Sequence, residues 1–294
     1  MNPTNNSHFK KLLKNININT FLNIFRNSVI KLSPFKDPSY RRHVCYTLDD
    51  YIYGIIDVLK NYSSWNSYTG KMKGDTLRKK HNEWSKLGIY DDIYVTLLSF
   101  HLKKNKCKKL KYQSMDSTNI RDINGNKMAK YNKTCKNQKG KTSKCIKINT
   151  LVDAEGIPIS VTIHEGNKYD STLYHKTMNK ILIENDPKKY QNNNQFKQYF
   201  ITDKGYDTKK IINNATKRGY NCIIPQNKRR IINKKLLRIM NNKQLRILKK
   251  RHIVENFFSW LKRFSKIKCL YERNIKSYKG LIFLAFSIIL ARRI

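Results

Sequence analysis

The segment Gln198–Asp207 reads QYFITDKGYD, and a short β-type run within it delivers Asp203. Gly205 allows the backbone to turn sharply just after this strand. Thr208–Arg218 then has a helical pattern, and Tyr220–Pro225 is a second β-type run. Strands that alternate with helices indicate an α/β fold, in which helices cover both faces of a mixed sheet.

The residues before this segment extend the predicted sheet. Leu110–Met115 is a β-type run that ends at Asp116, in the sequence YQSMDSTN. Cys145–Val152 and Ile157–Ile163 flank a short turn that contains glycine, so they predict a hairpin. A helix is expected from about Thr172 to Glu184. The order from residue 110 onward is therefore strand, hairpin, helix, strand, helix, strand, helix.

The first third of the chain has a different pattern. Apolar residues recur at helical spacing within 41–105, and a further apolar patch covers Phe21–Ile30. We therefore predict a helical N-terminal region over 1–105 and an α/β domain over 106–294. The apolar run Leu281–Leu290 is too short to span a bilayer and predicts a buried helix. Because the N-terminus also lacks the apolar core of a signal peptide, no membrane association is expected.

The composition is strongly basic, with 61 Lys and Arg against 20 Asp and Glu and a net charge of +41. Such an excess favours a polyanionic partner, because binding of phosphates releases counterions. Codon bias is the alternative, since Lys, Asn and Ile are all abundant, as in AT-rich genomes. None of the six cysteines forms a CxxC pair, and the histidines do not cluster with them. We therefore expect free thiols, with neither a zinc site nor a disulfide framework.

Three carboxylates stand out by their positions. Asp116 and Asp203 follow β-type runs, and Glu255 lies in an amphipathic helix predicted over about 244–264. Enzymes that transfer phosphoryl groups with two metal ions place the ions about 3.5–4 Å apart, between carboxylates from separate elements. We therefore identify these three residues as candidate metal ligands and catalytic groups.

The helix that carries Glu255 also carries cations on the same face. Arg251 lies four residues before Glu255, and Lys262 lies seven residues after it. This arrangement suits a metal ligand flanked by side chains that bind phosphate. An exposed face stabilised by ordinary i,i+4 charge pairs is the alternative.

Other acidic residues are expected to have structural roles. Asp153 lies in the predicted hairpin turn, and Asp170 and Asp207 are each positioned to cap the helix that follows. Asp116 itself precedes Ser117-Thr118-Asn119, which is equally compatible with a side-chain turn after a strand.

Five fragments, in order between residues about 45 and 293, resemble DDE transposases of the IS4/IS5 insertion-sequence group, which includes Harbinger-like relatives. They are Trp65 with EWSKLGIYDDI, MDSTNI, KINTLVDAEGIPISVTIHEGNKYDST, ITDKGYDT, and RHIVENFFSWLKRFSKI followed by SYKGLIFLAFSIILARR. The short interval between Asp203 and Glu255 leaves no room for the large β insertion of some relatives, so an IS5-like core fits better.

The resemblance implies an RNase H-like catalytic core and makes Asp116, Asp203 and Glu255 the DDE triad. The group's signature Tyr-x2-Arg-x3-Glu-x6-Lys maps onto Arg251, Glu255 and Lys262, but Leu248 stands at the Tyr position. The implied cofactors are two Mg²⁺ or Mn²⁺ ions held by the triad. The implied reaction is strand cleavage and strand transfer on double-stranded DNA, at transposon ends and target, by a homodimer.

We expect three cations, Arg251, Lys262 and Lys204, to contact DNA, together with the basic stretches 103–111, 127–147 and 226–238. The helical N-terminal region is the expected place for recognition of transposon ends. Three alternatives remain: a domesticated DNA-binding relative without transposition, a basic packaging protein, and a different RNase H-like nuclease such as a resolvase. The sequence does not predict a cellular compartment.

Overall fold

The computed structural model describes residues 18–33, 46–103, 105–122, 128, 130–136, 142–193, 195–227 and 239–293. These residues form two compact units. The first unit combines the residues up to His101 with those of 121–129 and those from Trp260 onward, and the second combines Leu102–Ile120 with those of 130–259. The C-terminal segment thus groups with the N-terminal helices, and the domain division at 105/106 stays a prediction. How function is divided along the chain stays a prediction.

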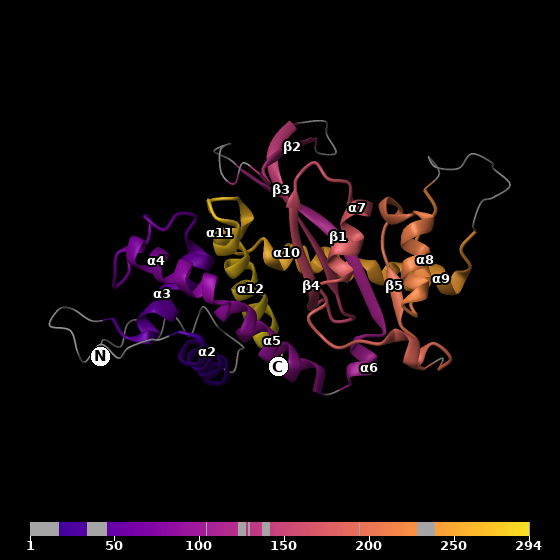
Figure 1. The fold of residues 1–294 in the computed structure, drawn as a ribbon, viewed down its shortest axis with the longest axis horizontal. Coiled ribbons are helices and arrows are strands. Elements are labelled where there is room, and N and C mark those ends of the chain that lie inside the picture. The colour runs from indigo at the N-terminus through magenta and orange to yellow at the C-terminus, as the bar shows by residue number, and fades with distance from the viewer. Residues whose placement is uncertain are drawn as a thin grey trace. The chain divides into compact units, whose positions relative to one another are not determined.

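The second unit is built on a six-stranded mixed sheet (Figure 1). Its strands are β1 (Tyr112–Arg121), β2 (Lys133–Lys136), β3 (Thr142–Val152), β4 (Pro158–Glu165), β5 (Tyr199–Ile201) and β6 (Asn221–Ile223). The order is β2-β3-β1-β5-β6, and β4 also pairs with β3. The β2–β3 and β3–β4 pairs are antiparallel, and the β1–β5 and β5–β6 pairs are parallel.

Helices cover both faces of this sheet. The elements are α6 (Lys106–Lys109), α7 (Asp170–Met178), α8 (Lys209–Lys217), α9 (Asn242–Leu248), α10 (His252–Leu261) and the 3-10 turns η2 (Pro187–Tyr190), η3 (Lys204–Tyr206) and η6 (Lys249–Arg251). Neighbouring residues of a strand point to opposite faces. Accordingly, Phe200 packs against Tyr174 of α7, and Ile201 packs against Ile247 of α9. The predicted α/β architecture with a mixed sheet flanked by helices is confirmed.

Several predicted boundaries in the second unit were wrong. β1 continues five residues beyond Asp116, because β-branched residues after the aspartate keep it extended beside β3. β2 lies in a stretch predicted to be a loop, where it pairs with the start of β3. α7 ends at Met178 rather than near Glu184. The helix predicted over 244–264 is present as α9 and α10, which the 3-10 segment η6 joins with a backbone that stays helical, and it ends at Leu261.

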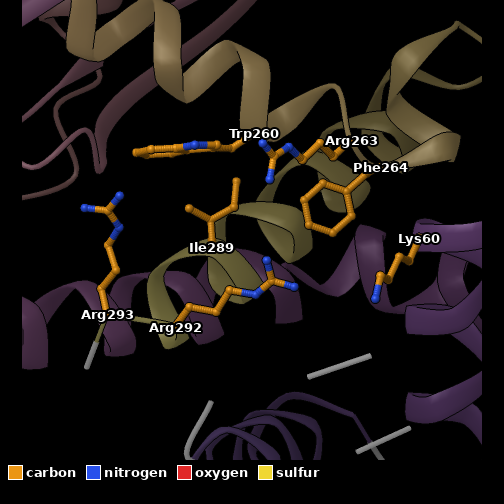
Figure 2. A pocket seen from close by; sticks show the side chains of 7 residues that line it. All are labelled: Lys60, Trp260, Arg263, Phe264, Ile289, Arg292 and Arg293. Carbon is orange, nitrogen blue, oxygen red and sulfur yellow. The ribbon is translucent and has the colours of Figure 1, made fainter. Parts of the chain in front are cut away.

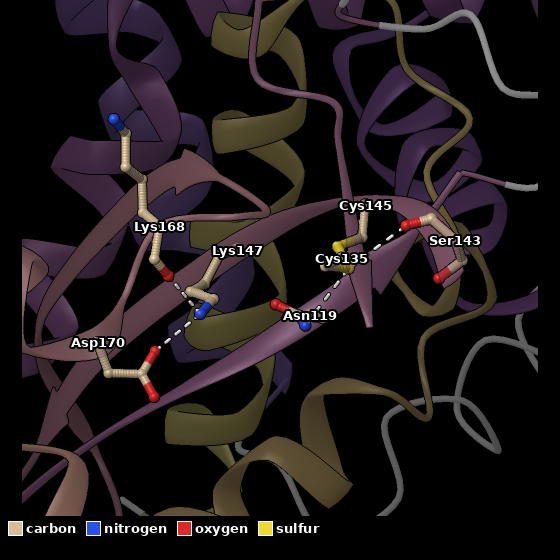
Figure 3. The surroundings of a disulfide bond; sticks show 7 residues. All are labelled: Asn119, Cys135, Ser143, Cys145, Lys147, Lys168 and Asp170. Carbon is tan, nitrogen blue, oxygen red and sulfur yellow. Dashed lines mark hydrogen bonds and ion pairs between the residues drawn. A yellow bond between two sulfur atoms is a disulfide. The ribbon is translucent and has the colours of Figure 1, made fainter. Parts of the chain in front are cut away.

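The hairpin of β2 and β3 carries a disulfide between Cys135 and Cys145 (Figure 3). The expectation of free thiols is therefore wrong for this pair, although Cys107, Cys222 and Cys269 keep their thiols and form no disulfide. The antiparallel register brings the two cysteines together, because Cys135 lies opposite Ser143, two residues before Cys145. Their separation of ten residues in the sequence gave no sign of this pairing.

The first unit is helical. Its elements are α2 (Ile18–Leu32), α3 (Leu48–Asn61), α4 (Gly74–Leu87), most of α5 (Ile89–Lys103), α11 (Ser265–Lys268) and α12 (Ile275–Ala291). A capping box at Thr47 starts α3, and Gly88, with a φ of 75°, ends α4. These findings confirm the helical N-terminal region and the buried C-terminal helix. Among the helices of the described residues, none has the length and apolarity to cross a membrane.

A buried polar cluster lies inside the first unit. The Trp65 indole nitrogen donates to Glu272 over 2.8 Å, and the Lys266 ammonium forms an ion pair with Glu272 at 3.0 Å. His81 lies beside the Trp65 ring and contacts the Tyr90 hydroxyl and the Ser277 carbonyl oxygen at 2.9 and 3.0 Å. These contacts satisfy charged and polar groups that would be costly to bury alone.

A cationic cavity of about 340 Å³ also belongs to the first unit (Figure 2). It is lined by Trp260, Phe264, Ile289 and the cations Lys60, Arg263, Arg292 and Arg293. The Arg293 guanidinium lies 4.5 Å from the centre of the Trp260 ring. Three of these cations stand at or just beyond the C-terminal ends of α3 and α12, where positive charge complements the helix dipole. The positive charge that lines the cavity is therefore explained by these helix ends.

Candidate active site

The pairing of β1 with β5 places Asp116 and Asp203 at the same level of the sheet. The two parallel strands pair Tyr112 with Tyr199 and Ser114 with Ile201. Each aspartate lies two residues beyond the last of these pairs. The two carboxylates therefore lie at the same level of the sheet, with Asp203 just past the end of β5 and Asp116 inside β1.

The Asp203 carboxylate is fixed by the turn that follows it. Its Oδ1 accepts a hydrogen bond of 2.8 Å from the backbone N–H of Gly205, so that Asp203 caps η3. A Cβ atom at position 205 would lie only 2.9 Å from this oxygen. A larger residue here would therefore push the Asp203 carboxylate aside. The turn predicted after the strand is present as η3, but Gly205 has no positive φ, so its place reflects this close contact rather than a left-handed backbone.

Arg251 joins Asp116 to Glu255. Its Nη1 donates to Asp116 Oδ2 over 3.2 Å, and its Nη2 donates to Glu255 Oε1 over 2.5 Å. Glu255 lies in the first turn of α10, and η6 presents Arg251 to β1. The i,i+4 charge pair considered from the sequence is present, but Arg251 also reaches a strand 135 residues away in the chain.

The environment of Asp116 disfavours its charged form. Burial raises the pKa of Asp116 to about 6, and the nearby carboxylates of Asp203 and Asp170 raise it as well. The Ser117 N–H, which donates to Asp116 over 2.8 Å, and the Arg251 guanidinium act in the opposite direction. A site of this kind gains stability when additional positive charge approaches it.

Asp170 belongs to this group of carboxylates, and its predicted role as a helix cap was wrong. It lies in the first turn of α7, where its carboxylate accepts hydrogen bonds from Ser117 Oγ at 2.6 Å and Lys147 Nζ at 2.9 Å. Lys147 also donates to the Lys168 carbonyl oxygen over 2.7 Å (Figure 3). The sequence pointed to this arrangement only in that Ser117, the partner of Asp170, directly follows Asp116.

Tyr206 is a site residue that sequence reasoning missed. It is completely buried, and its hydroxyl donates to Asn149 Oδ1 over 2.8 Å. Burial raises the pKa of Tyr206 well above its ordinary value, and Asp170, Asp116 and Asp203 raise it further. Tyr206 thus forms a neutral, hydrogen-bonded support beside the carboxylates.

Two other predicted structural aspartates had different outcomes. Asp153 is buried and accepts hydrogen bonds from the backbone N–H groups of Glu155 and Ile157, which confirms its role in the hairpin turn. Asp207 does not cap α8. Thr208 does so, and Asp207 instead accepts a bond of 2.7 Å from the Asn227 N–H.

The remaining residues singled out from the sequence are placed as follows. Lys204 is exposed in η3, directly after Asp203. Lys262 is an exposed residue of the first unit, just after α10. Leu248, at the Tyr position of the signature, packs against an apolar cluster formed by Ile201, Ile223 and Ile247. Much of the basic stretch 226–238 lies outside the described residues.

Within the described part of the chain, no three Asp, Glu, His or Cys side chains are positioned to hold a metal ion together. Asp116 and Glu255 each bond Arg251 instead. The chemistry of the site nevertheless suits a hard divalent cation, because all of its candidate ligands are carboxylate oxygens.

A family model described as the transposase DDE domain matches residues 109–290, which is more than half of the chain. The chain belongs to the DDE transposase family. Its mixed sheet flanked by helices agrees with the RNase H-like fold that this family implies. No curated protein matches the chain.

Membership of the family establishes a transposase-type function, with DNA as the class of substrate, and divalent metal ions are the family's general cofactor. The matched region contains Asp116, Asp203, Arg251, Glu255 and Lys262. The IS4/IS5 assignment and the roles of individual residues stay predictions.

Proposed function

We propose that this DDE transposase cuts and joins DNA strands at transposon ends, with Asp116, Asp203 and Glu255 as its catalytic carboxylates. The observation that carries the proposal is the arrangement of these residues. The parallel register brings the two aspartates to one level, and Arg251 links Asp116 to Glu255 from a separate element.

The three carboxylates are the proposed ligands of two Mg²⁺ or Mn²⁺ ions. The raised pKa of Asp116, beside two like charges, supports this assignment, because bound cations would relieve the repulsion. When bound, such ions activate the attacking oxygen and stabilise the leaving 3′ oxygen in phosphoryl transfer.

The chain's own residues supply positioning. The Gly205 N–H fixes the Asp203 carboxylate by donating to its Oδ1. Arg251 forms ion pairs with both Asp116 and Glu255. We propose that Arg251 transfers its hydrogen bonds to a DNA phosphate when substrate binds, and that Lys204 and Lys262 each bind a DNA phosphate as well.

Joining two transposon ends requires both ends to be held at once, so we propose that the protein acts as a homodimer on DNA. We propose that the helical N-terminal region, over 1–105, recognises the sequence of the transposon ends. A domesticated relative that binds DNA without transposing it is the competing proposal.

The test is cleavage of labelled DNA that carries the element's terminal repeats, with Mg²⁺, Mn²⁺ or EDTA. We expect nicking at the repeat ends that needs metal and falls by about three orders of magnitude or more in Asp116→Asn, Asp203→Asn and Glu255→Gln, with DNA binding kept. Asp186→Asn is the matched control, because this carboxylate caps η2, away from the site.

Two results would contradict the proposal. Tight binding of the repeats without cleavage under any metal would favour the domesticated protein. Cleavage by Asp203→Asn at the wild-type rate would show that Asp203 is not a catalytic residue.

A further inference from the structure

A basic groove with an aromatic floor lies in the second unit. It consists of two adjoining cavities of about 510 and 570 Å³, which share Lys111, Tyr112 and Lys250. We call it the tyrosine groove, and its defining residues are Lys108, Lys111, Tyr112, Tyr199, Arg246 and Lys250. None of these residues belongs to the carboxylate site described above.

The floor of the tyrosine groove is a stacked pair of rings. The centroids of Tyr112 and Tyr199 lie 5.6 Å apart, and their planes differ by 21°. Both residues are half-buried and pack against the apolar cluster that contains Ile201 and Ile247. Both also line the larger cavity, so the pair is a rigid surface that remains reachable from outside.

Positive charge surrounds this floor. The lining cations are Lys108, Lys109, Lys111, Lys243, Arg246 and Lys250, against a single lining carboxylate, Glu155. The Lys250 ammonium lies 4.9 Å from the centre of the Tyr112 ring, and that of Lys111 lies 5.9 Å from it. Cations around stacked aromatic rings are the features that bind unpaired nucleic acid, because bases stack on the rings and phosphates pair with the cations.

The groove and the carboxylates lie on the same face of the sheet. Tyr112 and Asp116 are four residues apart on β1, so their side chains point the same way. Four residues of strand span about 13 Å. Lys250, over Tyr112, directly precedes Arg251, which bonds Asp116. A DNA strand that leaves the carboxylates along η6 therefore reaches the tyrosine groove within a few nucleotides.

We infer that the tyrosine groove binds an unpaired stretch of the DNA substrate next to the reacting phosphate, with a base against the Tyr112–Tyr199 pair. Duplex DNA presents its backbone outward and keeps its bases stacked internally, so it would use the cations but not the rings. This inference rests on the proposed function, because it assumes that the DNA bound at the carboxylates continues into the groove.

The test compares a blunt DNA end with the same end carrying a single-stranded tail of six nucleotides, bound by the full chain in EDTA. A fluorescent 2-aminopurine base is placed at each tail position in turn. We expect about 10-fold tighter binding of the tailed DNA, and quenching at one or two adjacent positions, from stacking on the tyrosines.

Variants separate stacking from charge. Tyr112→Phe with Tyr199→Phe keeps both rings and should behave like the wild type, whereas the double change to Leu should abolish the quenching and the preference for a tail. Lys111→Gln with Lys250→Gln leaves the apolar cluster intact. This variant should bind tailed DNA more weakly than the wild type, and its affinity should depend less on salt concentration.

Equal affinity for blunt and tailed DNA, or quenching that survives the Leu changes, would overturn the inference. The proposed function is tested by a separate experiment, because the binding and quenching measurements do not require cleavage. If the protein cleaves DNA but shows no quenching, only the inference about the tyrosine groove is rejected. If quenching is seen but the protein never cleaves DNA, the catalytic proposal is rejected instead.

Discussion

Asp116 and Asp203 lie side by side because each follows, by two residues, the parallel pair formed by Ser114 and Ile201. The pairing of strands β1 and β5, rather than any local motif, therefore brings the two carboxylates together. Their closeness has an electrostatic cost, which appears in the raised pKa of Asp116. The Arg251 guanidinium, which donates to Asp116, offsets part of that cost.

Replacing Arg251 with Gln should strengthen metal binding but weaken catalysis. The guanidinium now holds one oxygen of Asp116 and one of Glu255, so a metal ion must compete with it for both. We expect Arg251→Gln to bind Mn²⁺ in the absence of DNA about 10-fold more tightly, by isothermal titration calorimetry, and to cleave DNA at least about 10-fold more slowly.

Two further variants sharpen this prediction. Arg251→Lys keeps the charge but cannot make the two-armed bond, so it should bind Mn²⁺ with intermediate affinity. Lys204→Gln removes an exposed cation next to Asp203 and should leave Mn²⁺ affinity within about 2-fold. Unchanged Mn²⁺ affinity in Arg251→Gln would show that the arginine does not compete with metal.

Asp170 provides a test of which carboxylates are catalytic. It raises the pKa of Asp116, but its own oxygen is engaged by Ser117 and Lys147. We expect Asp170→Asn to keep cleavage within about 10-fold of the wild type, because Asn can still accept a hydrogen bond. A loss as large as that of Asp203→Asn, in the same cleavage assay, would make Asp170 a fourth essential carboxylate.

The disulfide between Cys135 and Cys145 should stabilise the β2–β3 hairpin only under oxidising conditions. Closing a loop of this length contributes about 2–3 kcal/mol in the chain-entropy description. We expect the reductant TCEP to lower the stability of the second unit by this amount in urea unfolding. The double variant Cys135→Ser with Cys145→Ser should show no response to TCEP, and an equal response in both proteins would contradict the prediction.

The sequence predicted much of the sheet because its strands carry local signals. The hairpin of β3 and β4 was predicted by β-branched runs around a glycine-containing turn, and the turn after β5 by Gly205 beside Asp203. The three carboxylates could be proposed from the sequence because two of them follow β-type runs and the third shares a helix face with two cations. Their catalytic roles stay predictions.

What the sequence could not predict depends on pairing between distant segments. The role of Asp170 follows from its contact with Ser117, 53 residues away, whereas its place before a helix suggested only a cap. Tyr206 looked like part of a loop, but the chain buries it against Asn149 of β3. The disulfide likewise follows from the register of β2 with β3, and β2 has no strong pattern of its own.

The buried His81 predicts how the first unit responds to acid. Burial lowers the pKa of His81 from 6.5 to about 4, although Glu272 and the Ser277 carbonyl oxygen favour its charged form. Above pH 6.5 the histidine is neutral whether the unit is folded or unfolded. As the pH falls from 6.5 to 4, the unfolded chain takes up a proton that the folded unit does not, so stability is lost over this window.

The loss assigned to His81 is about 3 kcal/mol across that window. All three tryptophans belong to the first unit, so their fluorescence can report its unfolding in urea at pH 7.5, 6, 5 and 4. His81→Gln is the matched variant, because Gln can both donate and accept in place of the imidazole. It should be less stable than the wild type at pH 7.5, and the difference should shrink towards pH 4. A difference that is independent of pH would show that His81 does not set the acid response.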